Sequence, residues 1–148
     1  PPAQGRFPMR LSNHAAFHTG LQAPVAAEGR TRLPETLFTQ AKLPLIDGRG
    51  HIWWPGTATT AALRDYTLGH QVTEAYDFTA AIRSAAHEFA PDYFIFPAPG
   101  TTLVGAVAQS LILAGWKGMA DKADFQRIQA EAPLLISMAL PEQRALVA

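Results

Sequence analysis

Two histidines near the start of this chain, four positions apart, are the side chains best placed to do chemistry. They lie in the segment Asn13-His14-Ala15-Ala16-Phe17-His18-Thr19. Histidine changes its charge near neutral pH, so it serves as a general base or as a metal ligand. Most histidines serve as neither a base nor a ligand, so His14 and His18 can also be ordinary surface or core residues. The neighbouring residues must therefore distinguish among these three interpretations.

A zinc site is the first alternative. On a helix, residues four apart share one face, as in the H-E-x-x-H motif of zinc proteases. In this chain Ala15 stands where that motif has its glutamate general base, and no convincing third ligand is present, although His51 is a candidate. The sequence therefore predicts no metal site.

Other residue types exclude further kinds of chemistry. The chain contains no cysteine, which excludes a thiolate nucleophile, a thiolate zinc site and a disulfide scaffold. Gly100 and Gly105 have the spacing of a P-loop, but Ala106 stands where the phosphate-binding lysine is required. No G-x-S-x-G motif surrounds any of the serines Ser12, Ser84, Ser110 and Ser137.

Short strands and helices alternate in the elements that must position these residues. Apolar runs bounded by turn residues predict strands at 7–11, 43–46, 51–54 and 93–96, with a weaker one at 134–138. Apolar residues at helical spacing predict helices, in chain order, at 21–27, 35–41, 60–68, 80–90, 102–112 and 121–130.

Residues that typically begin or end helices lie at the ends of these predicted segments. Thr59 or Thr60 is predicted to cap the 60–68 helix, with Gly69 as its end. Thr79 is predicted to cap the next helix, and Thr101 or Thr102 the 102–112 helix, which Gly115 closes. The order of strands and helices indicates an α/β fold with short, mainly parallel strands and flanking helices.

Composition suggests that more protein covers this chain. Hydrophobic residues make up 48% and charged residues only 16%, which is low for a small independent domain. The 93–96 strand is apolar on both faces and should lie inside a covered sheet, yet few strands are available to flank it. The net charge is zero, so no basic field favours nucleic acid or an anionic membrane. No apolar run approaches the roughly 20 residues of a membrane span, and we expect a cytoplasmic protein.

A family resemblance follows from these motifs. Ala16-Phe17-His18-Thr19 is similar to the A-F-H-S motif around the catalytic histidine of malonyl-CoA:acyl-carrier-protein transacylases and polyketide-synthase acyltransferase domains. Further segments resemble the same family in the same order, over roughly Arg6 to Ile112: Leu43-Pro44-Leu45-Ile46-Asp47-Gly48, Leu68-Gly69-His70-Gln71-Val72 with Phe78-Thr79, and Pro91-Asp92-Tyr93-Phe94-Ile95 with Ala98-Pro99-Gly100-Thr101-Thr102-Leu103.

The resemblance implies a Ser–His transferase that moves a malonyl group from coenzyme A to the phosphopantetheine thiol of acyl carrier protein, in fatty acid or polyketide biosynthesis. His18 would be the general base, and the backbone carbonyl of Gln71 would orient its ring. Phe17 would contact the substrate and favour malonyl over methylmalonyl groups. No cofactor is implied beyond the substrates themselves.

The resemblance also implies that parts of the enzyme lie elsewhere. In this family the serine elbow precedes the histidine, so we expect an N-terminal part before Pro1 to carry it. Residues 1–112 would then be the C-terminal piece of the large α/β-hydrolase-like subdomain, and 113–148 an extension of unknown role. Thr19, Phe96 and Ala98 depart from the usual motifs. A non-catalytic scaffold of the same ancestry and an acyl-CoA thioesterase remain alternatives.

Overall fold

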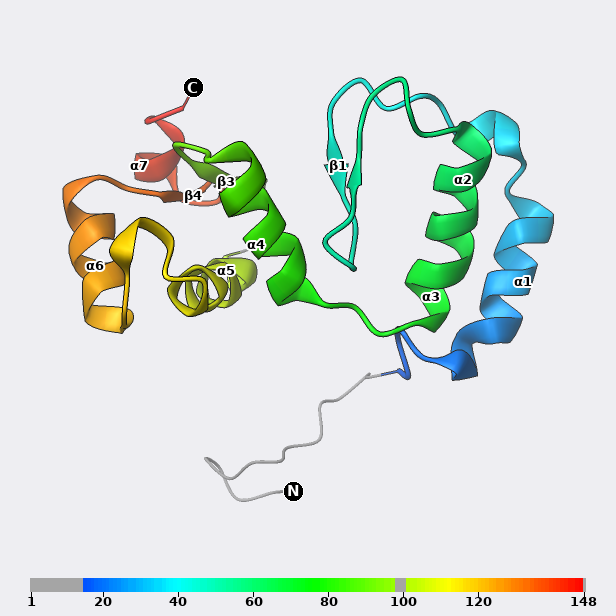
Figure 1. Cartoon of the computed structure of the whole chain (residues 1–148), viewed down its shortest axis with the longest axis horizontal. Coiled ribbons are helices and arrows are strands. Elements are labelled where there is room, and N and C mark those ends of the chain that lie inside the picture. The colour runs from blue at the N-terminus through cyan, green and yellow to red at the C-terminus, as the bar shows by residue number, and fades with distance from the viewer. Residues whose placement is uncertain (1–14, 98–100, 148) are drawn as a thin grey trace, which may run out of the picture. The chain divides into compact units, whose positions relative to one another are not determined.

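The computed structural model describes residues 15–97 and 101–147, and the chain divides into two compact units. One comprises Pro1–Gln40 and Thr59–Ala75, and the other comprises Ala41–Ala58 and Tyr76–Ala148. We call them the helical unit and the mixed unit, after the elements of their described residues (Figure 1). The architecture is therefore mixed α/β. The strand predicted at 7–11 lies outside the described residues.

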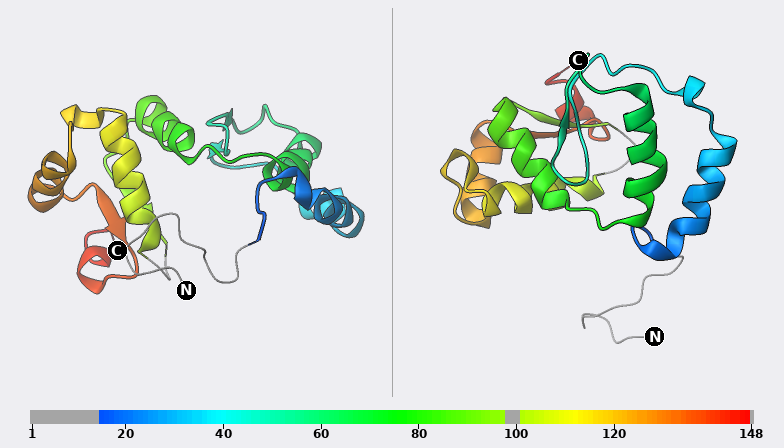
Figure 2. Two further views of the ribbon diagram at one scale, coloured as in Figure 1. Left: turned by 90° about the horizontal axis from the view of Figure 1, so that it is seen from below. Right: turned by 45° about the vertical axis from the view of Figure 1, so that its right-hand side comes forward.

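Two helical segments lie side by side in the helical unit, as the views of Figures 1 and 2 agree. The side chain of Arg64 joins them, because its guanidinium donates hydrogen bonds to the backbone carbonyls of Arg30 and Leu33. These carbonyls would otherwise lack partners at a helix C-terminus. The elements are η1 (Gly20–Gln22), α1 (Ala23–Arg32), η2 (Glu35–Leu37), α2 (Thr60–Asp65), the π-helical turn η3 (Tyr66–His70) and α3 (Gln71–Thr73).

The helix that begins after Thr59 is longer than the sequence predicts. Its cap is confirmed, since the Thr59 hydroxyl accepts a hydrogen bond from the N–H of Ala62 at 3.1 Å. The prediction that it ends at Gly69 is wrong, because the chain continues through η3 to Thr73. A Cβ at Gly69 would collide with the guanidinium of Arg30, so this glycine permits close packing instead of ending the helix.

Another predicted helix in this unit is largely absent. The segment 35–41 forms only the single turn η2, and Pro34 precedes that turn with an extended backbone. Its residues are mostly exposed and provide no buried apolar stripe. A helix this short gains little from backbone hydrogen bonds alone.

A β-hairpin opens the mixed unit. Strands β1 (Leu45–Ile46) and β2 (Ile52–Trp53) are antiparallel and pair Leu45 with Trp53 and Ile46 with Ile52. Gly50 adopts φ 77° in the connecting turn, a conformation that suits glycine. The Ser84 hydroxyl donates to the Gly50 carbonyl at 2.8 Å and ties the turn to the helix α4 (Phe78–Phe89).

The remaining elements of the mixed unit surround a small parallel sheet. Strands β3 and β4 pair in register, Phe94 with Leu135 and Phe96 with Ser137. A buried cluster that includes Leu111, Trp116 and Leu135 packs beside them. The elements are α4 (Phe78–Phe89), β3 (Phe94–Phe96), α5 (Thr102–Leu113), η4 (Trp116–Gly118), α6 (Lys122–Glu131), β4 (Leu135–Ser137) and α7 (Pro141–Arg144).

Two glutamine side chains occupy the edge of β4 that faces away from β3. Gln129 accepts hydrogen bonds from the N–H groups of Leu134 and Leu135 and donates one to the Leu135 carbonyl. Gln143 accepts a hydrogen bond from the N–H of Ser137. The side chains thus take the place of a neighbouring strand, and β4 is completely buried.

Several predictions about the mixed unit need correction. The description "mainly parallel" is wrong for the described residues, since one two-stranded sheet is parallel and the other antiparallel. Asp77, not Thr79, caps α4, because its carboxylate accepts a hydrogen bond from the N–H of Ala80. The strand at 93–96 is only partly buried, since Tyr93 is 53% and Ile95 51% exposed. In this chain nothing described covers that side of β3.

The segment 113–148 belongs to the same compact unit as the helices before it. Trp116 and Leu135 lie in one buried cluster with Val107 and Leu111 of α5. Residues on both sides of Ile112 therefore share one buried cluster, and the predicted extent of the family resemblance stays a prediction.

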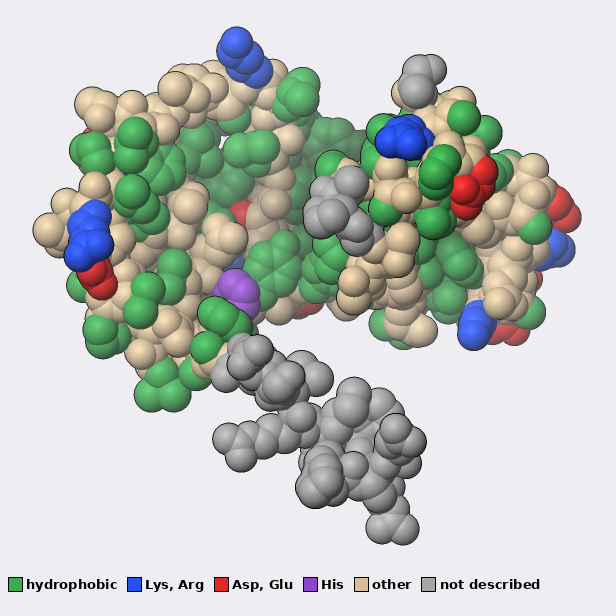
Figure 3. All heavy atoms as spheres, turned by 180° about the vertical axis from the view of Figure 1, so that it is seen from behind, with side chains coloured by type: hydrophobic (Ala, Val, Ile, Leu, Met, Phe, Trp, Pro, Cys, Tyr) green, Lys and Arg blue, Asp and Glu red, His purple; other side chains and the backbone are tan. Residues whose placement is uncertain are grey.

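Exposed apolar side chains occur in both units of the described structure, and the view in Figure 3 draws apolar side chains in green. Examples are Phe17, Leu21 and Leu37 in the helical unit and Leu43, Leu103 and Leu113 in the mixed unit. The longest described helices have 12 residues, and none is long and apolar enough to cross a bilayer.

Candidate functional site

A tight turn presents His18 just before the first helices of the helical unit. The Thr19 hydroxyl donates a hydrogen bond to the Ala16 carbonyl at 2.8 Å. The N–H of Gln22 bonds to the Thr19 carbonyl at 3.0 Å, which begins η1. His18 itself has φ 58°, in the left-handed region that residues with a Cβ rarely adopt. Strained residues of this kind concentrate at functional sites.

Gln71 lies near the C-terminal end of the helical unit's sequence. It follows the π-helical turn η3 and begins the final helical turn, which ends at Thr73. Carbonyl groups in the last turn of a helix have no partner within the helix. The Gln71 carbonyl can therefore accept a hydrogen bond from a donor outside the helix.

The imidazole of His18 is that donor. Its Nδ1 lies 2.6 Å from the carbonyl oxygen of Gln71, 53 positions along the chain. Both residues belong to the helical unit, so the contact lies within one compact unit. The expected contact between the His18 ring and the Gln71 carbonyl is thus confirmed, and it involves only the backbone of Gln71.

This hydrogen bond fixes the tautomer of the ring. A carbonyl oxygen can only accept, so Nδ1 must carry the proton. In the neutral ring Nε2 then holds the lone pair and is the basic atom. The pair thus has the arrangement of a general base with its orienting group.

Phe17 precedes His18 and is 60% exposed. It lies beside His18 in the turn, where the resemblance predicts a residue that contacts the acyl group. Its role in selecting that group stays a prediction.

The zinc alternative gains no support from the described residues. His18 lies in a turn instead of a helix, and His14 lies outside the part that the structure describes. His51 belongs to the other compact unit. Within 15–97 and 101–147, no three His, Cys, Asp or Glu side chains come together in a way that could hold a metal ion.

The described serines form ordinary hydrogen bonds with the backbone. The hydroxyl of Ser84 donates to Gly50, and that of Ser110 donates to Ala106 one helical turn earlier. Ser137 accepts a hydrogen bond from the N–H of Ala139. Ser12 and the loop residues Ala98 and Gly100 lie outside the described residues.

Asp47 is a polar centre that the sequence did not predict. Its buried carboxylate accepts hydrogen bonds from the N–H groups of Arg49 and His51, the Arg49 guanidinium and the Trp53 indole at 3.0 Å. Burial raises the pKa of this carboxyl, but these hydrogen bonds and the Arg49 charge lower it more, so the pKa falls below its ordinary value.

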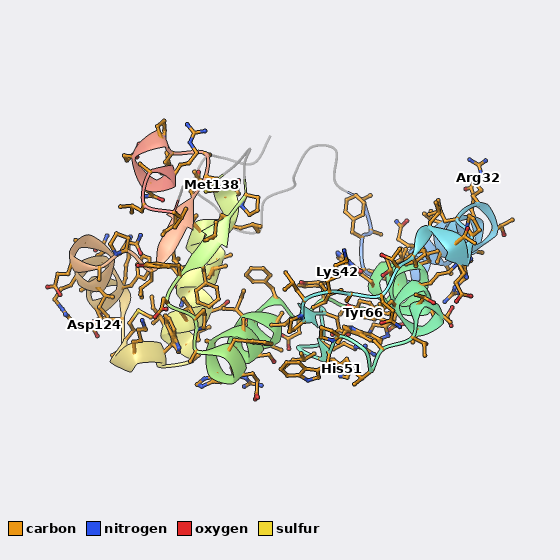
Figure 4. The ribbon with its side chains drawn as sticks, turned by 90° about the horizontal axis from the view of Figure 1, so that it is seen from above. Arg32, Lys42, His51, Tyr66, Asp124 and Met138 are labelled. Atoms are coloured by element: carbon orange, nitrogen blue, oxygen red, sulfur yellow. The ribbon has the colours of Figure 1, made fainter. Side chains whose placement is uncertain are left out.

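The role of this carboxylate is to organise the hairpin, because every donor around it comes from residues 49–53 of the same turn and strand. Figure 4 shows His51 on this hairpin and Tyr66 on the helix of the other unit. The sequence Asp-Gly-Arg-Gly followed by Trp53 could have indicated this arrangement, because it places one acceptor close to several donors.

Comparisons with protein-family models, with curated proteins and with solved structures found no match.

Proposed function

We propose that this chain is the histidine-bearing part of a Ser–His acyltransferase that moves malonyl groups from coenzyme A to acyl carrier protein. The observation that carries the proposal is the 2.6 Å hydrogen bond from His18 Nδ1 to the Gln71 carbonyl. It leaves Nε2 as the basic atom of an oriented imidazole. The motifs around both residues, which resemble those of malonyl transacylases, supply the substrate class.

The reaction has two halves in this proposal. Nε2 of His18 takes the proton of a serine hydroxyl while the serine oxygen attacks the thioester carbonyl of malonyl-CoA. The carbon–sulfur bond breaks, and the imidazolium returns the proton to the departing thiolate. The thiol of acyl carrier protein then attacks the malonyl ester, His18 removes the thiol proton, and the same proton reaches the departing serine oxygen.

The serine comes from sequence outside these 148 residues, since the chain has no G-x-S-x-G motif. The partner would be the N-terminal part of the same enzyme, and this chain would be the C-terminal piece of its α/β-hydrolase-like subdomain. Exposed apolar residues such as Leu21 and Ile95 are consistent with further protein covering this chain. We expect the enzyme to act in the cytoplasm.

Phe17 is proposed to select the acyl group. A ring beside the α-carbon would leave little room for the methyl branch of methylmalonyl-CoA. One methyl group in a shaped pocket is worth about 10- to 200-fold in specificity. Phe17→Ser in the serine-containing enzyme should therefore shift kcat/KM toward methylmalonyl-CoA, and an unchanged ratio would remove Phe17 from this role.

The test of the function compares the chain alone with the same chain joined to its serine-bearing part. Malonyl transfer to phosphopantetheinylated carrier protein is followed by mass spectrometry. The chain alone should be inactive, and the joined enzyme active. In the joined enzyme, His18→Ala should lower kcat by about 10²- to 10⁴-fold, since a general base contributes that much.

A matched control and two contrary outcomes sharpen this test. His87→Ala changes an exposed histidine on α4 and should leave kcat unchanged. Full kcat in His18→Ala would remove His18 from the mechanism. Release of free malonate at the same rate with and without carrier protein would identify a thioesterase instead.

A further inference from the structure

The turn before α1, at the blue end of the described chain in Figure 1, holds His18 in an unfavourable backbone conformation. Left-handed φ costs a residue with a Cβ about 1–2 kcal/mol, and His18 has φ 58°. Such a conformation persists only where neighbouring interactions oppose its relaxation. One interaction that spans this residue is the hydrogen bond from the Thr19 hydroxyl to the Ala16 carbonyl.

The hydrogen bond offsets a large part of this backbone cost. At 2.8 Å its geometry is good, and a side-chain hydrogen bond typically contributes about 0.5–1.5 kcal/mol. That is comparable with the backbone cost at His18. Thr19 also has an extended backbone, φ −138° and ψ 160°, which a β-branched residue favours. Hydroxyl and branched carbon therefore both stabilise the turn.

The backbone conformation of His18 determines where its ring points. A return of φ to negative values would swing the Cα–Cβ bond and move the imidazole by ångströms. The 2.6 Å contact between Nδ1 and the Gln71 carbonyl would then be lost. Without that acceptor, the proton would no longer be confined to Nδ1.

We infer that Thr19 is a positioning residue: its hydroxyl holds the turn that aims His18 Nδ1 at the Gln71 carbonyl and so sets the tautomer of the ring. The effect on the tautomer depends only on the structure of this chain. The effect on catalysis rests on the proposed function of His18 as a general base.

The experiment records long-range ¹H–¹⁵N correlations of the His18 ring at a pH where it is neutral. Three variants are compared with the unmodified chain. Thr19→Val removes the hydroxyl and keeps the shape. Thr19→Ser keeps the hydroxyl. Thr31→Val is the matched control, since the Thr31 hydroxyl also donates to a carbonyl, that of Ala27 at 3.1 Å, within α1 of the same unit.

The unmodified chain, Thr19→Ser and Thr31→Val should show the proton on Nδ1. Thr19→Val should show a mixture of both tautomers. Backbone amide spectra of α1 and α3 confirm that the helical unit remains folded in each variant. A pure Nδ1–H tautomer in folded Thr19→Val would overturn the inference, as would the same mixture in Thr31→Val.

Activity provides a second, separate measurement in the serine-containing enzyme. Thr19→Val should lower kcat by about 10- to 100-fold, because small displacements of a catalytic group have large effects. KM for malonyl-CoA should change less than about twofold. Thr19→Ser should restore kcat, and failure to restore it would count against the hydroxyl as the positioning group. Failure of the proposed function itself would appear differently, as unchanged kcat in His18→Ala.

Discussion

The helical unit and the mixed unit differ in what holds them together. In the described residues, the helical unit buries only a few apolar side chains, Ala26, Leu63 and Leu68. The other buried apolar side chains described all belong to the mixed unit, and Leu111, Leu135 and Ile136 are completely inaccessible there. The candidate base lies in the unit with the smaller core.

Polar contacts compensate for the small core of the helical unit. Arg64 joins the end of α1 to α2, the Thr19 hydroxyl closes the turn, and His18 joins that turn to α3. Contacts of this kind are directional, so they fix the orientation of a side chain more precisely than apolar burial does. The stability of the fold and the geometry of the candidate site therefore depend on different residues, so a substitution can change one without changing the other.

The largest expected effect is in the core of the mixed unit. Leu111→Ala should lower the free energy of unfolding by about 3–4 kcal/mol, because it removes a fully buried side chain and leaves a cavity. Urea denaturation measures the change. Leu113→Ala on the same helix is the control, since Leu113 is 68% exposed and should cost less than about 0.5 kcal/mol. Equal losses in the two variants would contradict the burial pattern.

Gln129→Leu should cost about 2–3 kcal/mol. It leaves the buried N–H groups of Leu134 and Leu135 and the Leu135 carbonyl without their partner at the edge of β4. The same denaturation experiment applies. Gln126→Leu replaces an exposed glutamine on α6 and should be nearly neutral. A neutral Gln129→Leu would show that β4 does not need its edge covered.

Asp47→Asn should cost about 2 kcal/mol at pH 7, because the amide cannot accept hydrogen bonds at both of its ends. The lowered pKa of Asp47 means that its contribution is complete above the unfolded value, 3.8, and is lost as the pH falls through the lower folded value. The difference between the two proteins should therefore be large at pH 7 and small in strong acid. Asp92→Asn, at an exposed position, should show no such difference.

The smallest expected effect is in the helical unit. Arg64→Met should cost about 1 kcal/mol by removing donors from the carbonyls at the end of α1. Amide hydrogen exchange should accelerate in α1 and α2 and remain unchanged in α5. Arg83→Met, an exposed change on α4, serves as the control. Faster exchange throughout the chain would mean that the two units do not differ in the way described.

Local sequence determined a large share of the secondary structure. Thr59 caps its helix as predicted, Gly115 follows the end of α5 with φ 61°, and Asp121 caps α6. These outcomes depend on side-chain and backbone chemistry within a few residues, which the sequence displays directly. The prediction that His18 and Gln71 would meet has a different basis, the resemblance to a family, because the two residues lie 53 positions apart.

Gly69 shows where local reasoning failed. A glycine often ends a helix, but at Gly69 the guanidinium of Arg30, 39 positions away, occupies the space that a side chain would need. The prediction that the 93–96 strand is covered failed for a similar reason, since Ile95 is exposed. The apolar residues of a strand show that it suits a buried place, but they do not show which residues cover it. Both outcomes depend on residues that are remote in sequence.

By itself, then, the sequence determined which residues can do chemistry here, where most helices begin and which kinds of site are excluded. Only the tertiary structure decided that the Gln71 carbonyl reaches His18, that the imidazole proton lies on Nδ1, and that His18 adopts a left-handed backbone conformation. The physical reason is that a hydrogen bond acts over about 3 Å, so its existence depends on how two distant helical segments pack.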